Sequence, residues 1–363
     1  MTCNDPPTVG VEEEHLTLDP QTGRVLDAGP TVVASVASPG LVTTEIMRYM
    51  VEARTPVCVT LEQVRTSIDD ARRRLARAAA DQHALSVPVG VPPSGYPREA
   101  AVTEEPRYVD MLHRFPDLVR TSGTCACHVH IGVPDRRLGL QVLLRLRPWL
   151  PSLVALTAAS PIWNGDDSGW ASRRFPLVAR WRTVRAPPYV TSVQEYDDRV
   201  HAAVTAGEAF DERSVYFLAR LSPRYPTVEV RVADVCASVA DAVAYVGLVR
   251  ALVALEIDAS MQGEPIVPVR DPDLMRACWS AARRGLSGDL PDPRTGRSRS
   301  ARDVVDGLLD LARPTLCSWG DEAVVLPTLT RLLDAGGGAE THRRVLRSTG
   351  SIAAYARALA APV

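Results

Sequence analysis

The sequence predicts an α+β fold built around an antiparallel sheet with one packed face and one polar, open face. Four segments alternate with the period of two that places successive side chains on opposite faces of a strand. In each segment one set of alternate positions is apolar, while the other set carries charged groups or histidines. The segments are residues 8–18, 41–58, 124–133 and 227–234. Antiparallel sheets commonly pack one face against a core and leave the other open, which produces this pattern.

The first of these segments, Thr8–Leu18 (TVGVEEEHLTL), carries two glutamates on one face. On an extended strand Glu12 and Glu14 project to the same side, about 7 Å apart, and their charges repel each other. Such charges are seldom buried unless something pairs them. Mg²⁺ could do so, because hard cations take carboxylate oxygens as ligands. The alternative is an edge strand with solvated glutamates, since an isolated pair of charged residues usually lies on a solvent-exposed face.

The segment after the first strand predicts a turn and then a second strand. Residues 19–24 (DPQTGR) have proline at the second position and glycine where φ can be positive, so the chain is predicted to fold back there as a hairpin. Residues 41–58 predict a further strand that ends before Pro56. On that strand Glu52 and Arg54 share one face, opposite apolar neighbours.

A helix is predicted over about residues 61–82, because Thr60 and Gln63 can form a capping box at its start. Apolar residues recur at helical spacing, with arginines between them, so this helix should be amphipathic, with one face packed on the sheet and the other exposed to solvent. Residues 86–107 are rich in proline and glycine and predict an irregular connection.

The segment 124–133 (TCACHVHIGV) places His128 and His130 on one face of a strand and apolar side chains on the other. Cys125, Cys127 and His128 form a local cluster that could bind a soft metal, but no second Cys/His cluster completes four zinc ligands. The seven cysteines are scattered and include no CxxC pair, which favours reduced thiols over a disulfide frame.

The middle of the chain predicts a buried helix and a polar loop. The apolar stretch 138–160 is predicted to be a helix that breaks near Pro148 and Pro151. Residues 160–174 form a loop dense in small, polar and aromatic residues, a composition often found where ligands bind.

The strand 227–234 (TVEVRVAD) has the cleanest alternation in the chain, with Glu229 and Arg231 on one face. Ser238 then begins a helix of about 22 residues that is apolar almost all round, as expected of a central buried helix.

The remainder, from about residue 270, is predicted to be helical, with a turn at 292–297 and a hinge at 336–338. No linker separates two units, so residues 1–363 are interpreted as a single domain.

Composition describes an ordinary globular protein, with 46% hydrophobic and 23% charged residues. The 41 basic residues nearly balance the 43 acidic ones, and a net charge of -2 argues against a nucleic-acid or membrane-surface role. No stretch is long and apolar enough to span a bilayer, and the N-terminal residues lack the features of a signal peptide. We therefore expect a cytoplasmic protein.

Each polar pair has an ordinary explanation when it is taken alone. Glu229 with Arg231 would usually be a surface ion pair, and either histidine would more often be a structural group than a ligand. However, a merely solvated face would carry lysine, threonine, serine and mixed charges. The predicted open face instead holds carboxylates, imidazoles and arginines, a set suited to metal ions, a polyphosphate and an acidic substrate.

Five motifs follow one another along the chain: GVEEEHLTLDPQTG (10–23), MVEARTPVC (50–58), CHVHIGVPD (127–135), SPIWNGDDSGWASRR (160–174) and SPRYPTVEVRVADVC (222–236). Together they resemble the type 2 glutamate–cysteine ligase family, also called carboxylate–amine ligases. The resemblance implies an antiparallel sheet curved into a funnel, with helices packed on its outer face, akin to the catalytic domain of glutamine synthetase. It also implies that the whole chain is one such catalytic domain.

The resemblance implies a reaction as well. ATP phosphorylates a substrate carboxylate, typically the γ-carboxyl of L-glutamate. The amine of a second substrate, typically L-cysteine, attacks the acyl phosphate and leaves γ-glutamylcysteine, ADP and phosphate. Mg²⁺ would bridge the nucleotide phosphates and neutralise charge during the transfer. The partners are therefore small-molecule acid and amine substrates, and a homodimer is left open.

Residue roles follow from the same resemblance. The metal candidates are Glu12, Glu14, Glu52, His128, His130 and Glu229. Arg231 and Glu229 are assigned catalytic roles, with Arg231 contacting the transferring phosphoryl group or the acyl phosphate. Substrate and nucleotide binding is assigned to Arg54, Arg173, Arg174 and Arg220. Arg173 or Arg174 would hold the acidic substrate's carboxylate in a bidentate contact.

Two departures from the family pattern leave alternatives. Many relatives have a tryptophan–aspartate–x–arginine motif where this chain has Phe217-Leu218-Ala219-Arg220, and the usual Pro-Thr form is absent around Arg182-Thr183-Val184. The same chemistry on a different acid and amine, as in secondary metabolism, is therefore an alternative, and so is a catalytically inactive relative. A third is a metal-dependent hydrolase that uses His128 and His130.

Overall fold

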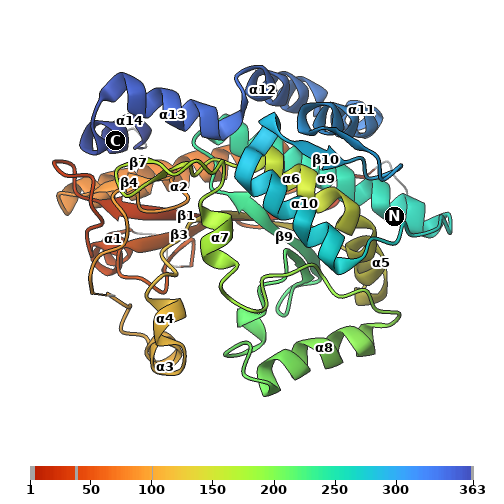
Figure 1. Cartoon of the computed structure of the whole chain (residues 1–363), viewed down its shortest axis with the longest axis horizontal. Coiled ribbons are helices and arrows are strands. Elements are labelled where there is room, and N and C mark those ends of the chain that lie inside the picture. Colours follow the sequence, from red (N-terminus) through yellow and green to blue (C-terminus); the bar gives the residue numbers. More distant parts are fainter. Residues whose placement is uncertain (1–4, 37–39, 100, 361–363) are drawn as a thin grey trace.

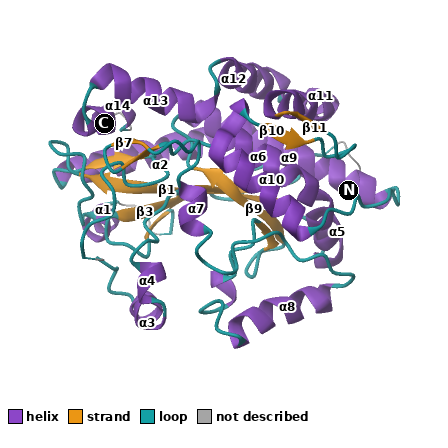
Figure 2. Ribbon diagram, viewed as in Figure 1, coloured by secondary structure: helices purple, strands orange, loops and turns teal. Residues whose placement is uncertain are grey.

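A seven-stranded antiparallel sheet crosses the middle of the protein (Figure 1 and Figure 2). The computed structural model describes residues 5–36, 40–99 and 101–360. The strand order is β2-β3-β1-β5-β9-β8, and β4 also pairs with β1. The strands are β1 (Val9–Leu18), β2 (Val42–Thr44), β3 (Met50–Arg54), β4 (Leu85–Val87), β5 (Ala126–Gly132), β8 (Ala219–Leu221) and β9 (Thr227–Asp234). The antiparallel prediction is confirmed, while the funnel-shaped curvature stays a prediction.

The four strands predicted from alternation, β3, β1, β5 and β9, lie next to one another in the sheet. On one face of the sheet, α2 (Leu61–Asp81) packs against β1 and β3, and α9 (Val239–Met261) packs against β5. Both begin as the sequence predicted, with a capping box between Thr60 and Gln63 and an N-cap at Ser238. Because side chains alternate along each strand, the residues that do not face these helices project from the opposite side of the sheet.

The covered face is not wholly apolar, and the prediction was wrong on this point. Glu13 is buried there and accepts hydrogen bonds from Nε (2.9 Å) and Nη2 (2.8 Å) of Arg72, which lies on α2. Arg72 also donates to the carbonyl oxygens of Cys236 and Ala237. The pair can be buried because it is bidentate and its other donors are used, so it ties β1, α2 and the segment after β9 together.

Two predicted strands differ from the observed ones. After β1 the turn forms, but only Leu18 and Val25 then pair before α1 (Gly29–Ser35) begins, so there is no full hairpin. The segment 41–58 holds two short antiparallel strands, β2 and β3, rather than one. Strands of three residues are too short to show an alternation, which is why their boundaries were missed.

The other departures from the predicted elements are also short strands. The irregular connection 86–107 overlaps β4, which pairs with β1. The C-terminal region includes the hairpin β10 (Asp289–Pro291) and β11 (Ser298–Ser300), which flanks the turn predicted at 292–297. The loop 160–174 includes the hairpin β6 (Ile162–Trp163) and β7 (Asp166–Asp167).

The helix predicted over 138–160 is broken at its prolines, as expected. It consists of α5 (Arg136–Leu146), the 3₁₀ turn η1 (Arg147–Trp149) and α6 (Leu150–Thr157). The six cysteines within the described residues are free thiols, and Cys3 lies outside those residues.

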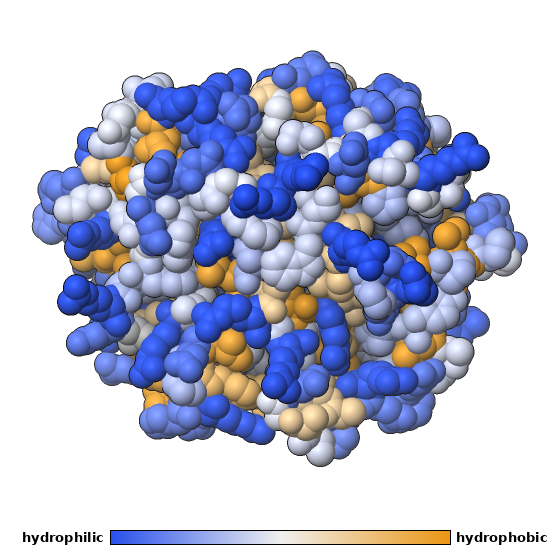
Figure 3. Space-filling view, viewed as in Figure 1, coloured by the Kyte–Doolittle hydropathy of each residue, from blue (hydrophilic) through white to orange (hydrophobic). Residues whose placement is uncertain are grey.

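The remaining helices lie around the sheet. They are α3 (Pro106–Arg114), α4 (Pro116–Val119), α7 (Arg174–Val178), α8 (Val193–Thr205), η2 (Glu212–Ser214), α10 (Asp271–Arg284), η3 (Gly285–Ser287), α11 (Ala301–Trp319), α12 (Glu322–Asp334), α13 (Gly337–Thr349) and α14 (Ile352–Leu359). In Figure 1, α11 to α14 lie along the top, while α3, α4 and α8 lie along the bottom. The face in Figure 3 is mostly hydrophilic, with small apolar patches. Among the described residues, no helix has the length and apolar character needed to cross a membrane.

Candidate active-site cavity

One cavity, of about 260 Å³, opens on the uncovered face of the sheet. Its lining includes a polar pair from each of the four central strands. The sequence-predicted residues that line it are Glu12, Glu14, Glu52, Arg54, His128, His130, Arg174, Arg220, Glu229 and Arg231. Groups that lie more than 200 positions apart in the sequence therefore meet in one concave site. Its size is of the order expected for a small-molecule site.

The sheet register explains why these side chains meet. Glu12 lies opposite Arg54 of β3 on one side and His128 of β5 on the other. His130 lies opposite Glu229 of β9. Directly opposed residues in an antiparallel pair lie on the same face, with Cβ atoms about 4.5–5.5 Å apart. The ionisable groups thus form a continuous row across four strands.

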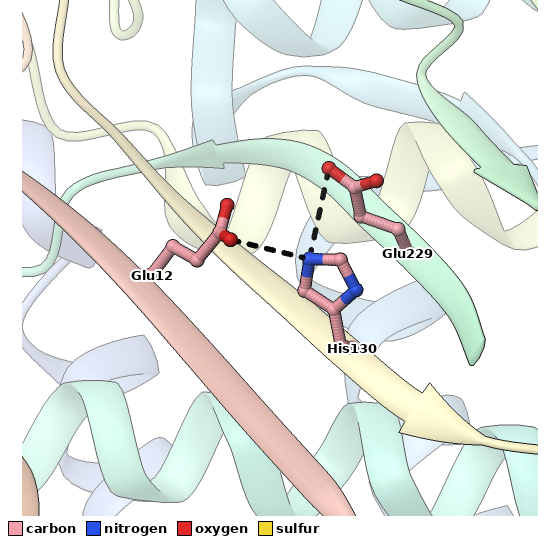
Figure 4. Close-up of side chains that lie close together, drawn as sticks. All are labelled: Glu12, His130 and Glu229. Atoms are coloured by element: carbon pink, nitrogen blue, oxygen red, sulfur yellow. Dashed lines mark ion pairs between the residues drawn. The ribbon is translucent and has the colours of Figure 1, made fainter. Parts of the chain in front are cut away.

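The first group of potential metal ligands consists of Glu12, His130 and Glu229, whose side chains point toward one another (Figure 4). Nε2 of His130 lies 3.8 Å from Oε1 of Glu12 and 3.8 Å from Oε1 of Glu229. The other ring nitrogen, Nδ1, is 3.0 Å from Oγ1 of Thr227, and this contact orients the ring. The nitrogen that faces the two carboxylates is buried and has no hydrogen-bond partner.

Two further groups share members with the first. Glu12, Glu52 and His128 form the second, and Glu14, Glu45 and Glu52 form the third. Within each group the nearest ligand atoms all lie within 4.8 Å of one another. Glu45 was missed from the sequence because it lies in the bend between β2 and β3, where no alternation marks it.

The histidines shape the protonation of Glu12. Burial raises the pKa of this carboxyl, but the nearby imidazoles of His128 and His130 outweigh burial and leave the pKa below its ordinary value. Burial and the nearby charge of Arg231 lower the pKa of His128 to about 4. At neutral pH the site therefore holds an ionised Glu12 beside a neutral imidazole, and both are forms that bind metal ions.

In the third group, in contrast to Glu12, the carboxyl groups have raised pKa values. Burial, followed by the charge of Glu45, raises the pKa of Glu14 to about 8, although its Oε2 accepts a hydrogen bond from the amide of Ala126 at 2.7 Å. Burial and the neighbouring charges of Glu12 and Glu45 raise the pKa of Glu52 well above its ordinary value. Buried carboxyl groups this close together cannot all ionise unless positive charge is added among them.

Two arginines hold Glu229 as a carboxylate. Arg220 donates from Nε to Oε2 of Glu229 at 2.7 Å, and Arg231 donates from Nη1 to Oε1. Burial raises the pKa of Glu229, but Arg231 and Arg220 outweigh it and lower the pKa below its ordinary value. Glu229 therefore fixes the guanidinium of Arg231 at the floor of the cavity.

Comparison with known proteins identifies the family. Residues 8–359 match the sequence profile of glutamate–cysteine ligase family 2 (GCS2). The chain belongs to this family. A relative from Salinispora tropica, provisionally named glutamate–cysteine ligase 2, is 41% identical over 355 residues, which cover 96% of this chain and 94% of the relative. A similarly named relative from Nocardia farcinica is 39% identical over 98% of this chain and 93% of the relative.

Solved structures share the fold of this GCS2 protein at low sequence identity. A glutamate–cysteine ligase from Francisella tularensis in complex with AMP has a TM-score of 0.75 and 14% identity, over 98% of this chain and 88% of the other. A bifunctional glutathione synthetase from Pasteurella multocida has a TM-score of 0.69 and 15% identity, over 98% of this chain and 52% of the other. The family match identifies the chain as an ATP-dependent carboxylate–amine ligase.

The expectation for Arg173 requires a correction within this ligase. Arg173 does not line the cavity, and its guanidinium lies 5.6 Å from the centre of the Trp163 ring. Arg174 does line the cavity, but Asp234 and two carbonyl oxygens bind its Nε and Nη2 atoms. Adjacent residues at the start of α7 point in different directions, so only Arg174 reaches the site.

Several cavity residues of the ligase carry no signal in the sequence, because they lie on loops or short helices. Arg107 of α3, which lines the cavity, binds Asp211 with two hydrogen bonds, from Nε at 2.8 Å and from Nη2 at 2.9 Å, and this ties α3 to the segment before Tyr216. Tyr216, Arg224 and Tyr225 also line the cavity. Such residues are brought to the site by tertiary packing rather than by a local pattern.

Proposed function

We propose that the cavity joins the carboxylate of an acidic substrate to the amine of a second substrate through an acyl phosphate formed from ATP. The pair typical of the family is L-glutamate and L-cysteine, which gives γ-glutamylcysteine, ADP and phosphate. The observation that carries this proposal is the meeting of carboxylates, imidazoles and guanidinium groups from four strands in one cavity. Phosphoryl transfer needs positioning and charge stabilisation above all, and these groups can supply both.

The donor set fits Mg²⁺. Three carboxyl groups, Glu14, Glu45 and Glu52, lie together with raised pKa values, so a cation among them would be stabilised by their ionisation. The buried Nδ1 of His128 and Nε2 of His130 have no hydrogen-bond partner and face carboxylates. Carboxylate oxygens are the ligands that Mg²⁺ prefers.

The three groups described above would hold the metal ions: Glu12, His130 and Glu229; Glu12, Glu52 and His128; and Glu14, Glu45 and Glu52. Bound Mg²⁺ would neutralise charge on the phosphate oxygens of the nucleotide.

The arginines would either contact the substrates or hold the residues that do. Arg231, held by Glu229, would stabilise the charge of the phosphoryl group as it moves to the substrate's carboxylate. Arg220 would keep Glu229 in place, since its other donors bind the carbonyl oxygens of Arg213 and Val215. Arg54, which pairs with Glu52, would help to orient a bound anion. Arg174 would contribute a positive charge beside Glu14.

A different acid and amine pair is the second candidate function. Leu218, which stands where many relatives have an acidic residue, lines the cavity and is 4% exposed. An apolar side chain at that place changes what a substrate can contact. We further expect the chain to work as one catalytic domain in the cytoplasm, and a homodimer stays a prediction.

The test is ADP release by the purified chain with ATP and Mg²⁺, offered panels of acids and amines. We expect release that needs both an acid and an amine, and mass spectrometry should detect the amide. Turnover with glutamate and cysteine would support the pair typical of the family, whereas turnover only with another pair would support the second candidate. Hydrolysis with zinc or manganese and no ATP would contradict both and favour a metal-dependent hydrolase.

A further inference from the structure

One wall of the cavity, beside Arg231, is apolar. β8 and β9 pair with Ala219 opposite Val230, so Leu218 is the cross-strand neighbour of Arg231, and the Arg231 amide donates to the Leu218 carbonyl at 3.0 Å. Directly opposed side chains lie on the same face of a sheet, so Leu218 stands next to the guanidinium that faces the cavity. Trp181, Val184 and Tyr216 line the same cavity.

These four residues line the cavity from two neighbouring segments, and we call them the apolar wall. The Leu218 amide donates to the carbonyl of Arg185 at 3.0 Å, and the Tyr216 amide donates to Oγ1 of Thr183 at 3.1 Å, so the segments 181–185 and 214–218 run side by side. The rings of Trp181 and Tyr216 pack edge to face, with centroids 5.5 Å apart.

The polar atom of Trp181 is already used. Its Nε1 donates to Oγ of Ser122 at 3.1 Å, which leaves the rest of the indole as apolar surface. Trp181 and Val184 are 5% and 8% exposed, so the wall is a packed surface with little freedom to rearrange.

The charges around the apolar wall are mainly positive. The Arg231 guanidinium lies 5.8 Å from the centre of the Tyr216 ring, and Arg107 also lines the cavity. The carboxylates that line the cavity all come from β1, β3, β9 or the bend at Glu45. Neither of the two wall segments contributes one to the lining. A substrate ammonium group placed against the wall would lose its hydration close to two guanidinium groups, and the wall segments offer no carboxylate to pair with it, which is unfavourable.

We propose that Trp181, Val184, Tyr216 and Leu218 form a specificity surface that binds an uncharged hydrocarbon or aromatic part of a substrate. This inference rests on the proposed function and deepens it by naming the substrate class. That class is an acid or an amine that carries an apolar group in place of an ammonium group. Burying an apolar part of the substrate against the wall removes apolar surface from water, which is favourable. A charged group in the same place would lose its hydration, which is unfavourable. Either the acid or the amine could carry the apolar group, so the test examines the two substrates separately.

The test compares matched ligands that differ by a methyl and an ammonium group. The acid arm compares 2-methylglutarate with glutamate, and the amine arm compares propylamine with ethylenediamine. Each arm measures binding by calorimetry in the presence of Mg²⁺ and a non-hydrolysable ATP analogue, and ADP release with ATP. We expect the wild-type chain to favour the methyl member by about tenfold or more in at least one arm. The arm with the preference identifies which substrate the wall binds.

Variants of Leu218 then tie the preference to the wall. Leu218→Asp should reduce the preference by about tenfold or reverse it, while Leu218→Met should keep it, because methionine is also apolar. Leu218→Asn replaces the aspartate variant if that one does not fold. Val267→Asn, whose side chain is 47% exposed and does not line the cavity, is the matched control.

Three results would overturn the inference. The first is a preference for the ammonium member in both arms, and the second is an unchanged preference for the methyl member in Leu218→Asp. The third is weaker binding of the ATP analogue in Leu218→Asp while the preference for the methyl member is unchanged. The last result would assign the wall to the nucleotide base instead. Failure of the proposed function gives a different result, because no acid and amine pair would then release ADP even where the binding preference is present.

Discussion

At the residue scale, Glu12 is the carboxylate on which the cavity most depends. It belongs to two of the three potential ligand groups and faces both histidines. We predict that Glu12→Gln lowers the rate of ADP release by about 100-fold or more, because two adjacent groups of metal ligands lose the charge of a shared carboxylate. The melting temperature should change little, since glutamine keeps the volume. Glu340→Gln on α13, away from the cavity, is the control, and near-wild-type turnover of Glu12→Gln would contradict the assignment.

Glu13 is the neighbouring residue on the opposite face, and its role is structural. Glu13→Gln would leave Arg72 buried without its counter-charge. We predict a loss of about 3–5 kcal/mol in the free energy of unfolding, the usual cost of breaking a buried pair. The exposed pair of Glu62 and Arg65 is the matched control, because solvent screens this pair and Glu62→Gln should leave stability almost unchanged. Urea unfolding measures both, and equal effects would contradict the prediction.

Glu256 on α9 gives a dependence of stability on pH away from the cavity. Burial raises its pKa from 4.5 to about 7, although its carboxylate accepts a hydrogen bond from Nε1 of Trp149. The folded state therefore binds this proton more tightly than the unfolded state. Its stabilising effect is fully present below about pH 4.5 and is lost as the pH rises through about 7.

We predict that the wild-type chain loses about 2 kcal/mol of stability relative to Glu256→Gln between pH 5 and pH 8, as expected for a pKa raised by this amount. Glutamine cannot ionise, so it removes the dependence while keeping an oxygen for Trp149. The measurement is urea unfolding of both proteins across that range. A constant difference between them would show that Glu256 does not titrate with the raised pKa.

At the element scale, the length of each strand decided what the sequence could predict. β1, β5 and β9 have 7–10 residues, long enough for alternation to separate the faces and to place Glu12, His128 and Glu229 on the cavity side. β2, β4 and β8 have three residues each and gave no such signal. Glu45 and the residues of the apolar wall lie on bends and loops, so only the tertiary structure brings them to the site.

The start of α2 provides a prediction about a single element. The Thr60 side chain accepts a hydrogen bond from the Gln63 amide at 3.2 Å, and the Gln63 side chain reaches back to Thr60. We predict that Thr60→Ala lowers the free energy of unfolding by about 1 kcal/mol, because an amide of the first turn loses its partner. Thr66→Ala, at an exposed position inside the same helix, should be neutral or slightly stabilising, because alanine favours the helix. Urea unfolding of both variants checks this, and an equal effect would contradict it.

At the scale of the whole molecule, the order of the strands could not be read from the sequence. The row of ionisable groups exists because β1 lies between β3 and β5, and β5 lies between β1 and β9. The pairing of β1 with β5 joins segments more than 100 residues apart, as with Glu12 and His128, and local patterns carry no information about such pairs. The family resemblance predicted an antiparallel sheet without a strand order, and the alternation predicted which side chains share a face.

This long-range construction predicts that ligands stabilise the whole chain. Mg²⁺ with an ATP analogue would link strands that otherwise carry repelling carboxyl groups, and a ligand that binds only the folded state at 100 times its Kd adds about 2.7 kcal/mol to the stability. For a chain of this size we expect the melting temperature to rise by about 3–4 °C. EDTA should reverse the rise, and Glu12→Gln should reduce it, whereas Glu340→Gln should not. An unchanged melting temperature at saturating ligand would show that the row of carboxylates does not bind the metal–nucleotide complex.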